Sequence, residues 1–265
     1  MSFSVRRVGA MTLRYWYLLR SSWPRLLELV YWPTMQMLVW GFLQLYLAEN
    51  HSTFARASGA LIGAVLLWDV LFRGQLGFSI SFLEEMWSRN IGNLMMSPLR
   101  PTEFVAALML MSLIRLAIGM IPVTGMAAAF FGFNIYGLGL GLAAFFANLM
   151  FTSWAIGLLV SGLVLRNGLG AETLAWSLMF LMMPLACVYY PVSTLPGWLQ
   201  PVAWALPPTY VFEGMRAALL EQVFRTDLML QALGLNALYL AVGFGAFILL
   251  LRSARRRGSL LAMGE

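Results

Sequence analysis

The sequence contains no lysine, and its 265 residues include a single cysteine and a single histidine. One cysteine, Cys187, excludes a disulfide bond within the chain and any cysteine-rich metal site. One histidine, His51, argues against a histidine-based metal centre and against a Ser-His-Asp triad. Without lysine, the phosphate-binding loop GxxxxGK[ST] of P-loop ATPases is excluded as well. We therefore expect no catalytic residues, no metal and no cofactor in this chain.

Charge is also scarce, because 11% of the residues are charged and 61% are apolar. A soluble domain would carry about 25% charged residues, and a single soluble core stops growing near this length. The net charge of +6 rests entirely on arginine, and the positions of these arginines favour a membrane surface over nucleic acid. We predict an integral membrane protein in contact with lipid, with no nucleic-acid partner.

Six apolar stretches have about the length that a helix needs to cross the membrane, which is roughly 20 residues for a hydrocarbon core of about 30 Å. They are too continuously apolar for the strands of an outer-membrane barrel, in which polar and apolar residues alternate. We therefore predict an all-α membrane protein with one transmembrane domain over residues 26–251. The six predicted spans are Leu26–Leu47, Ala57–Phe82, Phe104–Phe131, Leu138–Leu165, Ala171–Tyr189 and Leu228–Leu251.

Both segments that flank this domain are basic. Residues 1–25 contain five arginines among apolar and aromatic residues, and Arg7 and Arg14 share one helical face. This pattern predicts an amphipathic helix at the cytoplasmic interface; the alternative is an irregular basic tail. Residues 252–265 carry four more arginines and are predicted to form a cytoplasmic basic tail.

The distribution of arginine predicts the orientation, because cytoplasmic loops are enriched in basic residues. With the N-terminus inside and six spans, twelve arginines fall on cytoplasmic segments and three on outer segments. Both termini are therefore predicted to be cytoplasmic. The inner set is Arg6, Arg7, Arg14, Arg20, Arg25, Arg89, Arg100, Arg166, Arg252, Arg255, Arg256 and Arg257, and the outer set is Arg56, Arg216 and Arg225.

Three charged residues fall within predicted spans, where charge is expensive. Asp69 and Arg73 are four residues apart on one helical face, a spacing that allows an ion pair. One interpretation is a structural pair, and the other is a polar lining of a transport pathway. Arg115 has no acidic residue nearby in sequence, so we expect it to pair with Asp69 or with another acid across helices.

The cytoplasmic loop between the second and third spans is longer than a connection requires. Glu84 and Glu85 suit the N-terminal end of a helix, and the residues Trp87, Ile91, Leu94 and Met95 recur at helical spacing. Pro98 would end the helix. We predict a short amphipathic helix over Glu84–Pro98, either lying on the membrane surface without a partner or docking into a groove of another protein.

The segment Cys187–Tyr210, on the outer side, remains apolar but contains five prolines. A continuous helical span cannot accommodate that many, and irregular backbone at membrane depth must be covered by protein or line a cavity. We predict a re-entrant hairpin of short helices that dips back from the outer side.

These two segments resemble the ABC-2 family of ABC exporter permeases. The resemblance lies in the stretch Leu94–Phe104, in Tyr190–Gln200 and in Leu206–Tyr210, which follow in the order typical of that family, and it extends over nearly the whole chain. Arg89-Asn90 stand where many members carry a Gly-Thr pair. The resemblance assigns ATPase coupling to Glu84, Glu85, Trp87, Arg89, Asn90, Leu94, Met95, Ser97 and Pro98. It assigns a re-entrant gate to Tyr190, Pro191, Leu195, Pro196, Trp198, Pro207, Pro208, Thr209 and Tyr210.

The resemblance also implies partners and a location. It implies two ATP-binding cassette subunits that hold ATP and magnesium, a second copy of the permease in a homodimer, and the bacterial cytoplasmic (inner) membrane. The implied activity is export of a lipid-like, glycan-linked or hydrophobic substrate, without ATP hydrolysis by this chain. The alternative is a secondary transporter driven by an ion gradient.

Overall fold

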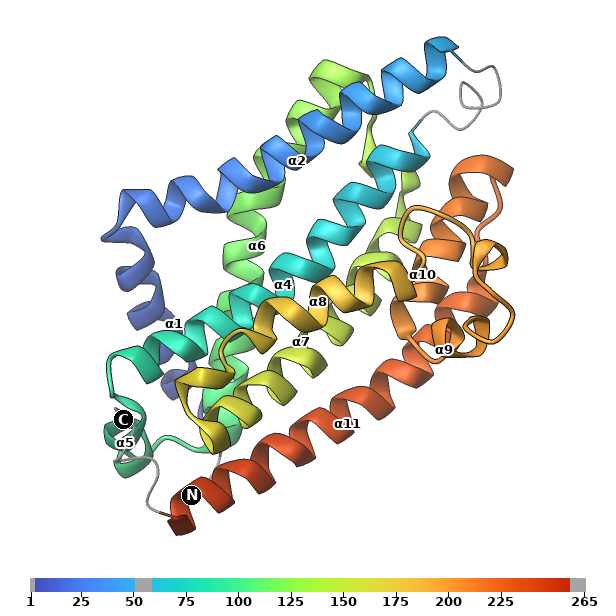
Figure 1. Cartoon of the computed structure of the whole chain (residues 1–265). Coiled ribbons are helices and arrows are strands. Elements are labelled where there is room, and N and C mark those ends of the chain that lie inside the picture. Colours follow the sequence, from blue (N-terminus) through green and yellow to red (C-terminus); the bar gives the residue numbers. More distant parts are fainter. Residues whose placement is uncertain (1–2, 51–58, 258–265) are drawn as a thin grey trace.

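The computed structural model describes residues 3–50 and 59–257, so His51, Arg56 and the last eight residues lie outside the described part. Every regular element in the described residues is a helix (Figure 1). Within the described ranges, four helices are long and apolar enough to cross a membrane. They are α4 (Ala60–Trp87), α6 (Pro101–Phe131), α7 (Leu140–Asn167) and α11 (Thr226–Arg257). The prediction of an all-α fold is confirmed for these residues.

The other two predicted spans differ from these four helices. Helix α2 (Trp23–Asn50) has 28 residues, which is long enough, but it is less apolar than the others. Helix α8 (Leu174–Leu185) has only 12 residues, or about 18 Å at 1.5 Å per residue. A continuous helix over Ala171–Tyr189 is therefore wrong: the chain forms a 3₁₀ turn, η2 (Leu169–Ala171), before α8.

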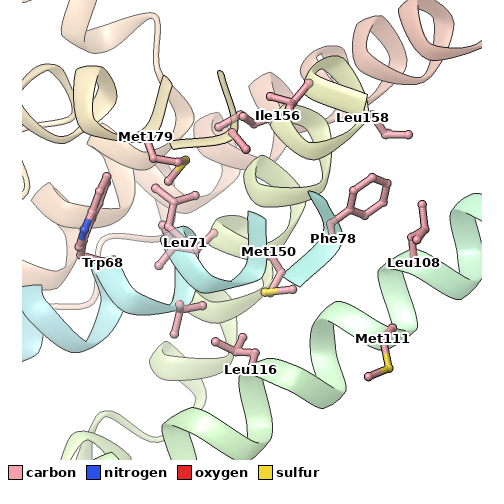
Figure 2. Packing of buried hydrophobic residues seen from close by; sticks show 14 of the residues in the cluster. Trp68, Leu71, Phe78, Leu108, Met111, Leu116, Met150, Ile156, Leu158 and Met179 are labelled. Carbon is pink, nitrogen blue, oxygen red and sulfur yellow. The ribbon is translucent and has the colours of Figure 1, made fainter. Parts of the chain in front are cut away.

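Helix α4 is the centre of the molecule, since it contacts α2, α6, α7, α8 and α10. Figure 2 shows how its side chains pack: Leu71 and Phe78 of α4 lie among residues of α6 and α7, such as Leu108 and Met150. Helix α11 packs mainly along α7, and its buried residues, such as Phe247 and Leu251, belong to the same core.

Small residues allow the closest helix contacts. A Cβ atom at Gly77 of α4 would lie 3.2 Å from the Cα of Ser112 on α6. At Gly243 of α11 it would lie 2.7 Å from the carbonyl oxygen of Ala155 on α7, a distance that real Cβ atoms essentially never show. These glycines therefore set the spacing of α4 from α6 and of α7 from α11.

Short elements cap the two ends of the bundle (Figure 1). At the end that we call the α5 end lie α1 (Val5–Arg20), α5 (Ile91–Met96) and the C-terminal turns of α4 and α11. At the opposite end, the α9 end, lie α9 (Gln200–Trp204), α10 (Pro207–Arg216) and two further single turns. These are η3 (Val192–Thr194) and the π-helical η4 (Ala217–Glu221), and the 3₁₀ turn η1 (Ile135–Leu138) precedes α7.

The C-terminal arginines continue the last helix. Residues 252–257 belong to α11, so within the described residues they do not form the separate tail that the sequence predicts. Arginine is a good helix former, and positive charge is favourable at a helix C-terminus. The Nη2 atom of Arg255 lies 2.9 Å from the Sδ atom of Met95, so this end of α11 touches α5.

Candidate functional site

The connection between α4 and α6 is not the single helix that the sequence predicts. Helix α4 runs through Glu84 and Glu85 to Trp87, so these two acids end a helix rather than begin one. The amide of Asn90 donates to the carbonyl of Glu85 (2.9 Å), and the amide of Arg89 donates to that of Met86 (3.0 Å). This is the Schellman pattern that closes a helix, and it places Arg89 in the left-handed region with φ of 53°.

Helix α5 then forms the projecting part of the connection. Leu94 and Met95 are half-buried and pack against the core. Met96 is 79% exposed, and Asn93, Ser97 and Pro98 are exposed beside it. The assignment of ATPase coupling to Leu94 and Met95 stays a prediction, and Met96 is the most exposed apolar side chain of α5.

Buried ion pairs connect the α5 end to the bundle. Glu84 accepts from the Nη2 atom of Arg115 at 2.9 and 3.0 Å and from the Nη1 atom of Arg25 at 3.1 Å. Arg115, which is 5% exposed, thus pairs with Glu84 on α4 and not with Asp69. Burial of this pair is tolerable because one carboxylate faces two guanidinium groups.

Helix α1 is bound to the same end by its polar face. The fully buried Glu85 accepts from the side chains of Arg14 and Asn90, so one carboxylate joins α1 to the residue that precedes α5. The carboxylate of Glu103 accepts from the Nε atom of Arg7 (2.7 Å) and the amide of Ser4 (2.8 Å). This hydrogen bond to Glu103 raises the pKa of Arg7.

A cavity of about 970 Å³ opens between α2, α4, α6 and α8. Its walls are mainly aromatic and aliphatic, with a few charged side chains. The lining residues are Arg25, Glu28, Leu29, Trp32, Met35, Gln36, Val39, Trp40, Trp68, Phe72, Arg73, Leu76, Gly77, Ile80, Glu84, Trp87, Arg115, Trp176, Phe180, Met183 and Tyr189.

The cavity extends lengthwise along the bundle. On α2 its lining runs from Arg25 to Trp40, which is about 22 Å at 1.5 Å per residue. Near the α5 end it includes Glu84 and Trp87, and its far end includes Tyr189. The rings of Trp40 and Tyr189 are stacked there, with centroids 4.6 Å apart and planes at 19°. The stack joins α2 to the segment that follows α8.

The predicted pair of Asp69 and Arg73 is present, and its members differ in access to the cavity. The Nε atom of Arg73 lies 3.2 Å from the Oδ1 atom of Asp69, so the two side chains form an ion pair across one helical turn. Asp69 is fully buried behind the wall, whereas Arg73 lines the cavity. Both earlier interpretations thus fit the same pair, because the acid is buried and the base reaches the cavity.

The predicted gate residues form a compact cap at the α9 end but do not line the cavity. Within this cap, the Oγ1 atom of Thr209 donates to the carbonyl of Ala203 (2.6 Å), and the hydroxyl of Tyr190 donates to that of Pro184 (2.8 Å). The remaining gate residues are Pro191, Leu195, Pro196, Trp198, Pro207, Pro208 and Tyr210. Trp198 is 76% exposed.

Sequence reasoning missed the aromatic wall and the polar anchor of the cap. Gln36, Trp40 and Trp176 line the cavity from spans whose composition marks them only as apolar. Glu213 and Arg216 hold the cap, since Glu213 accepts from the amide of Val192 (2.7 Å) and Arg216 donates to the carbonyl of Cys187 (3.0 Å). The one feature of the sequence that could have predicted this aromatic lining of the cavity is the presence of tryptophan inside predicted spans.

The described residues include no group of three or more His, Cys, Asp or Glu side chains that could hold a metal ion. The arrangement consists of a cavity, a short projecting helix near one end of it, and a cap at the opposite end of the bundle. These parts suit the binding and movement of a ligand.

Comparison with known proteins agrees with this arrangement. The chain matches the family of ABC-2 type transporter membrane domains over residues 9–220, which covers α2, α4, α5, α6, α7 and α8 entirely. A search of curated proteins finds no match. Members of this family are permease components, not catalytic ATPases, and their partners are ABC ATPases. The chain belongs to the ABC-2 family and is the transmembrane subunit of an ABC transporter.

Proposed function

We propose that the chain is the membrane half of an ATP-driven exporter, in which two copies combine with two ATPase subunits that bind ATP and magnesium. The proposed cargo is lipid-like, glycan-linked or hydrophobic, which fits the mainly apolar lining of the cavity. The proposed location is the bacterial inner membrane with both termini in the cytoplasm. Twelve arginines on the predicted inner segments support this orientation.

The end of the cavity nearest α5 carries this proposal. Glu84 and Trp87 line the cavity and also form the last turn of α4, immediately before the turn that leads into α5. Only a few residues separate α5 from the cavity lining, so a movement of α5 caused by an ATPase would be transmitted directly to the cavity. Glu85, which holds Asn90, makes this connection stiff.

The second copy is proposed from the exposed side of the bundle. The outward face of α2 is strongly apolar and aromatic, and α8, beside the same cavity, exposes Phe180 at 61%. A second permease covering this side would enclose the cavity between the two copies. In this arrangement α2 and the extended segment around α8 serve as two further membrane crossings, which gives the proposed six spans.

The proposed coupling is tested on the complex of this chain with its ATPase. Met96→Asp should abolish co-purification of the ATPase or reduce MgATP hydrolysis by the complex severely, because it places a charge on the most exposed apolar side chain of α5. Leu140→Asp is the matched control, since Leu140 is 91% exposed at the start of α7 and should leave association unchanged. An unaltered complex with Met96→Asp contradicts the proposal. Transport that continues without any ATPase would favour the ion-gradient alternative.

A further inference from the structure

Arg73 is placed as a ligand-binding group in the middle of the cavity. It lies 13 residues from the first residue of α4 and 14 from the last, or about 20 Å from either end. A charged side chain at this depth is expensive unless it is paired or faces a wet cavity. Arg73 meets both conditions, because Asp69 neutralises it from behind and its side chain, 13% exposed, lines the cavity.

The contacts of Arg73 leave its donors available. Asp69 approaches the Nε atom at 3.2 Å, and among the described residues Nε is the one nitrogen of this guanidinium that is both fully enclosed and without a hydrogen bond, whereas Nη1 and Nη2 are not in that set. The terminal amino groups therefore keep access to the cavity. A guanidinium presents a planar pair of such donors, which matches the oxygens of a phosphate.

The rest of the wall suits an apolar chain attached to that phosphate. Trp68, Phe72 and Leu76 of the same helix as Arg73 also line the cavity, as does Trp176 of α8, and these side chains offer large apolar surfaces. Toward the α5 end, Arg25 and Arg115 share the single carboxylate of Glu84, so this group of three residues carries one excess positive charge. Glu28 of α2 is a further acid that lines the cavity.

We propose that the cavity binds amphiphiles that carry a phosphate group, with the phosphate held by Arg73 and the apolar chain along the aromatic wall. Asp69 acts as a positioning residue that orients the guanidinium. This inference rests on the proposed function, since it names the substrate class of the same cavity. It is tested by equilibrium binding, which needs neither transport nor ATP hydrolysis.

The probes are three amphiphiles with the same chain and different headgroups, namely octyl phosphate, octyl glucoside and octyltrimethylammonium. They are titrated into the complex in digitonin, which carries no phosphate, and inorganic phosphate serves as the source without a chain. We expect octyl phosphate to bind at least tenfold more tightly than the other three. Tightest binding of the ammonium or glucoside, or equal binding of inorganic phosphate, would overturn the proposal.

Variants test the residue assignment through the sign of their effects. Arg73→Gln should weaken octyl phosphate binding about tenfold or more, and Glu28→Gln should strengthen it because an opposing charge is removed. Both changes should act in the opposite direction, or not at all, on octyltrimethylammonium. Arg225→Gln is the control, since Arg225 pairs with Asp227 at an exposed position outside the cavity. This variant should bind octyl phosphate with the affinity of the unmodified protein.

Folding is controlled by a charge-balanced variant. Arg73→Gln leaves Asp69 buried without its partner, whereas Asp69→Asn with Arg73→Gln removes both charges. The double variant should keep the unfolding temperature and still lose octyl phosphate binding; if it binds octyl phosphate normally, the proposal is wrong. Because Glu28 is exposed, Glu28→Gln folds in any case, and an unchanged or lowered affinity there also counts against the proposal. ATPase association is read separately, so its loss would contradict the proposed function rather than this inference.

Discussion

Arg89 adopts a left-handed backbone conformation that is unfavourable for a residue with a Cβ atom. It follows the last turn of α4 with φ of 53°, a region that a residue with a Cβ atom enters at a cost and that glycine enters freely. Arg89→Gly should therefore raise the free energy of unfolding by about 0.5–1 kcal/mol. Thermal unfolding followed by tryptophan fluorescence measures this, and an unchanged or lower midpoint would contradict the assigned turn.

Glu85 is the residue that joins α1 to the beginning of α5. Glu85→Gln should lower the free energy of unfolding by about 1–2 kcal/mol, because Arg14 loses its counter-charge next to a buried group. Arg225→Gln breaks an ion pair whose partners are both about half exposed, and such pairs contribute little. Urea or heat unfolding of the two variants side by side checks the contrast; equal losses would show that burial of Glu85 is not the cause.

For single residues, the sequence predicts an ion pair only when the two charged residues lie close together in the chain. Asp69 and Arg73 are separated by one helical turn, so their spacing alone predicts the pair. Arg115 and Glu84 are 31 residues apart, and the sequence offers several acids for that arginine. Their pairing depends on how α4 and α6 pack, which a single sequence does not contain.

Substitutions at two glycines of α11 distinguish the effect of close helix packing from the effect of helix propensity. Gly243→Val should destabilise the protein by about 2 kcal/mol or more, because its Cβ would meet the carbonyl oxygen of Ala155 at 2.7 Å. Gly245→Val has nothing within 4 Å of its Cβ and should leave stability nearly unchanged. The midpoints of thermal unfolding compare the pair directly, and similar values would mean that α7 and α11 are not in contact at this point.

Long apolar elements were predictable and their ends were not. The existence of α4, α6, α7 and α11 follows from apolar runs longer than 20 residues. The acids Glu84 and Glu85 suggested a helix beginning, but tertiary ion pairs with Arg25, Arg115 and Arg14 hold them at a helix end. The short length of α8 likewise depends on how the α9 end is capped.

The exposed Trp198 tests the orientation of the whole molecule. We expect a cysteine introduced at this position to react with a membrane-impermeant maleimide added to intact cells, because the α9 end is proposed to face outward. The natural Cys187 is fully buried and should contribute little background. Reaction only after the cytoplasmic side is opened would reverse the proposed orientation.

The cavity is a property of the whole molecule, and the sequence indicated it only in part. The intramembrane charge Arg73 pointed to a polar pathway, whereas the aromatic wall from Trp40, Trp68 and Trp176 needs three helices to meet. Nothing in the period of an apolar span distinguishes a lipid-facing tryptophan from one that lines a cavity. The predicted gate residues follow from a proline-rich apolar segment and from the family resemblance, and they form the cap at the α9 end; their role as a gate stays a prediction.

The central claim is that this chain is a gate moved by an ATPase bound at α5. Labelling of a cysteine in place of Phe180, which is exposed and lines the cavity, measures that movement in proteoliposomes. With the ATPase present, MgATP should change the labelling rate from the α5 side severalfold, and for the chain alone MgATP should have no effect. A response of the chain alone to MgATP, or no response in the complex, would contradict the account.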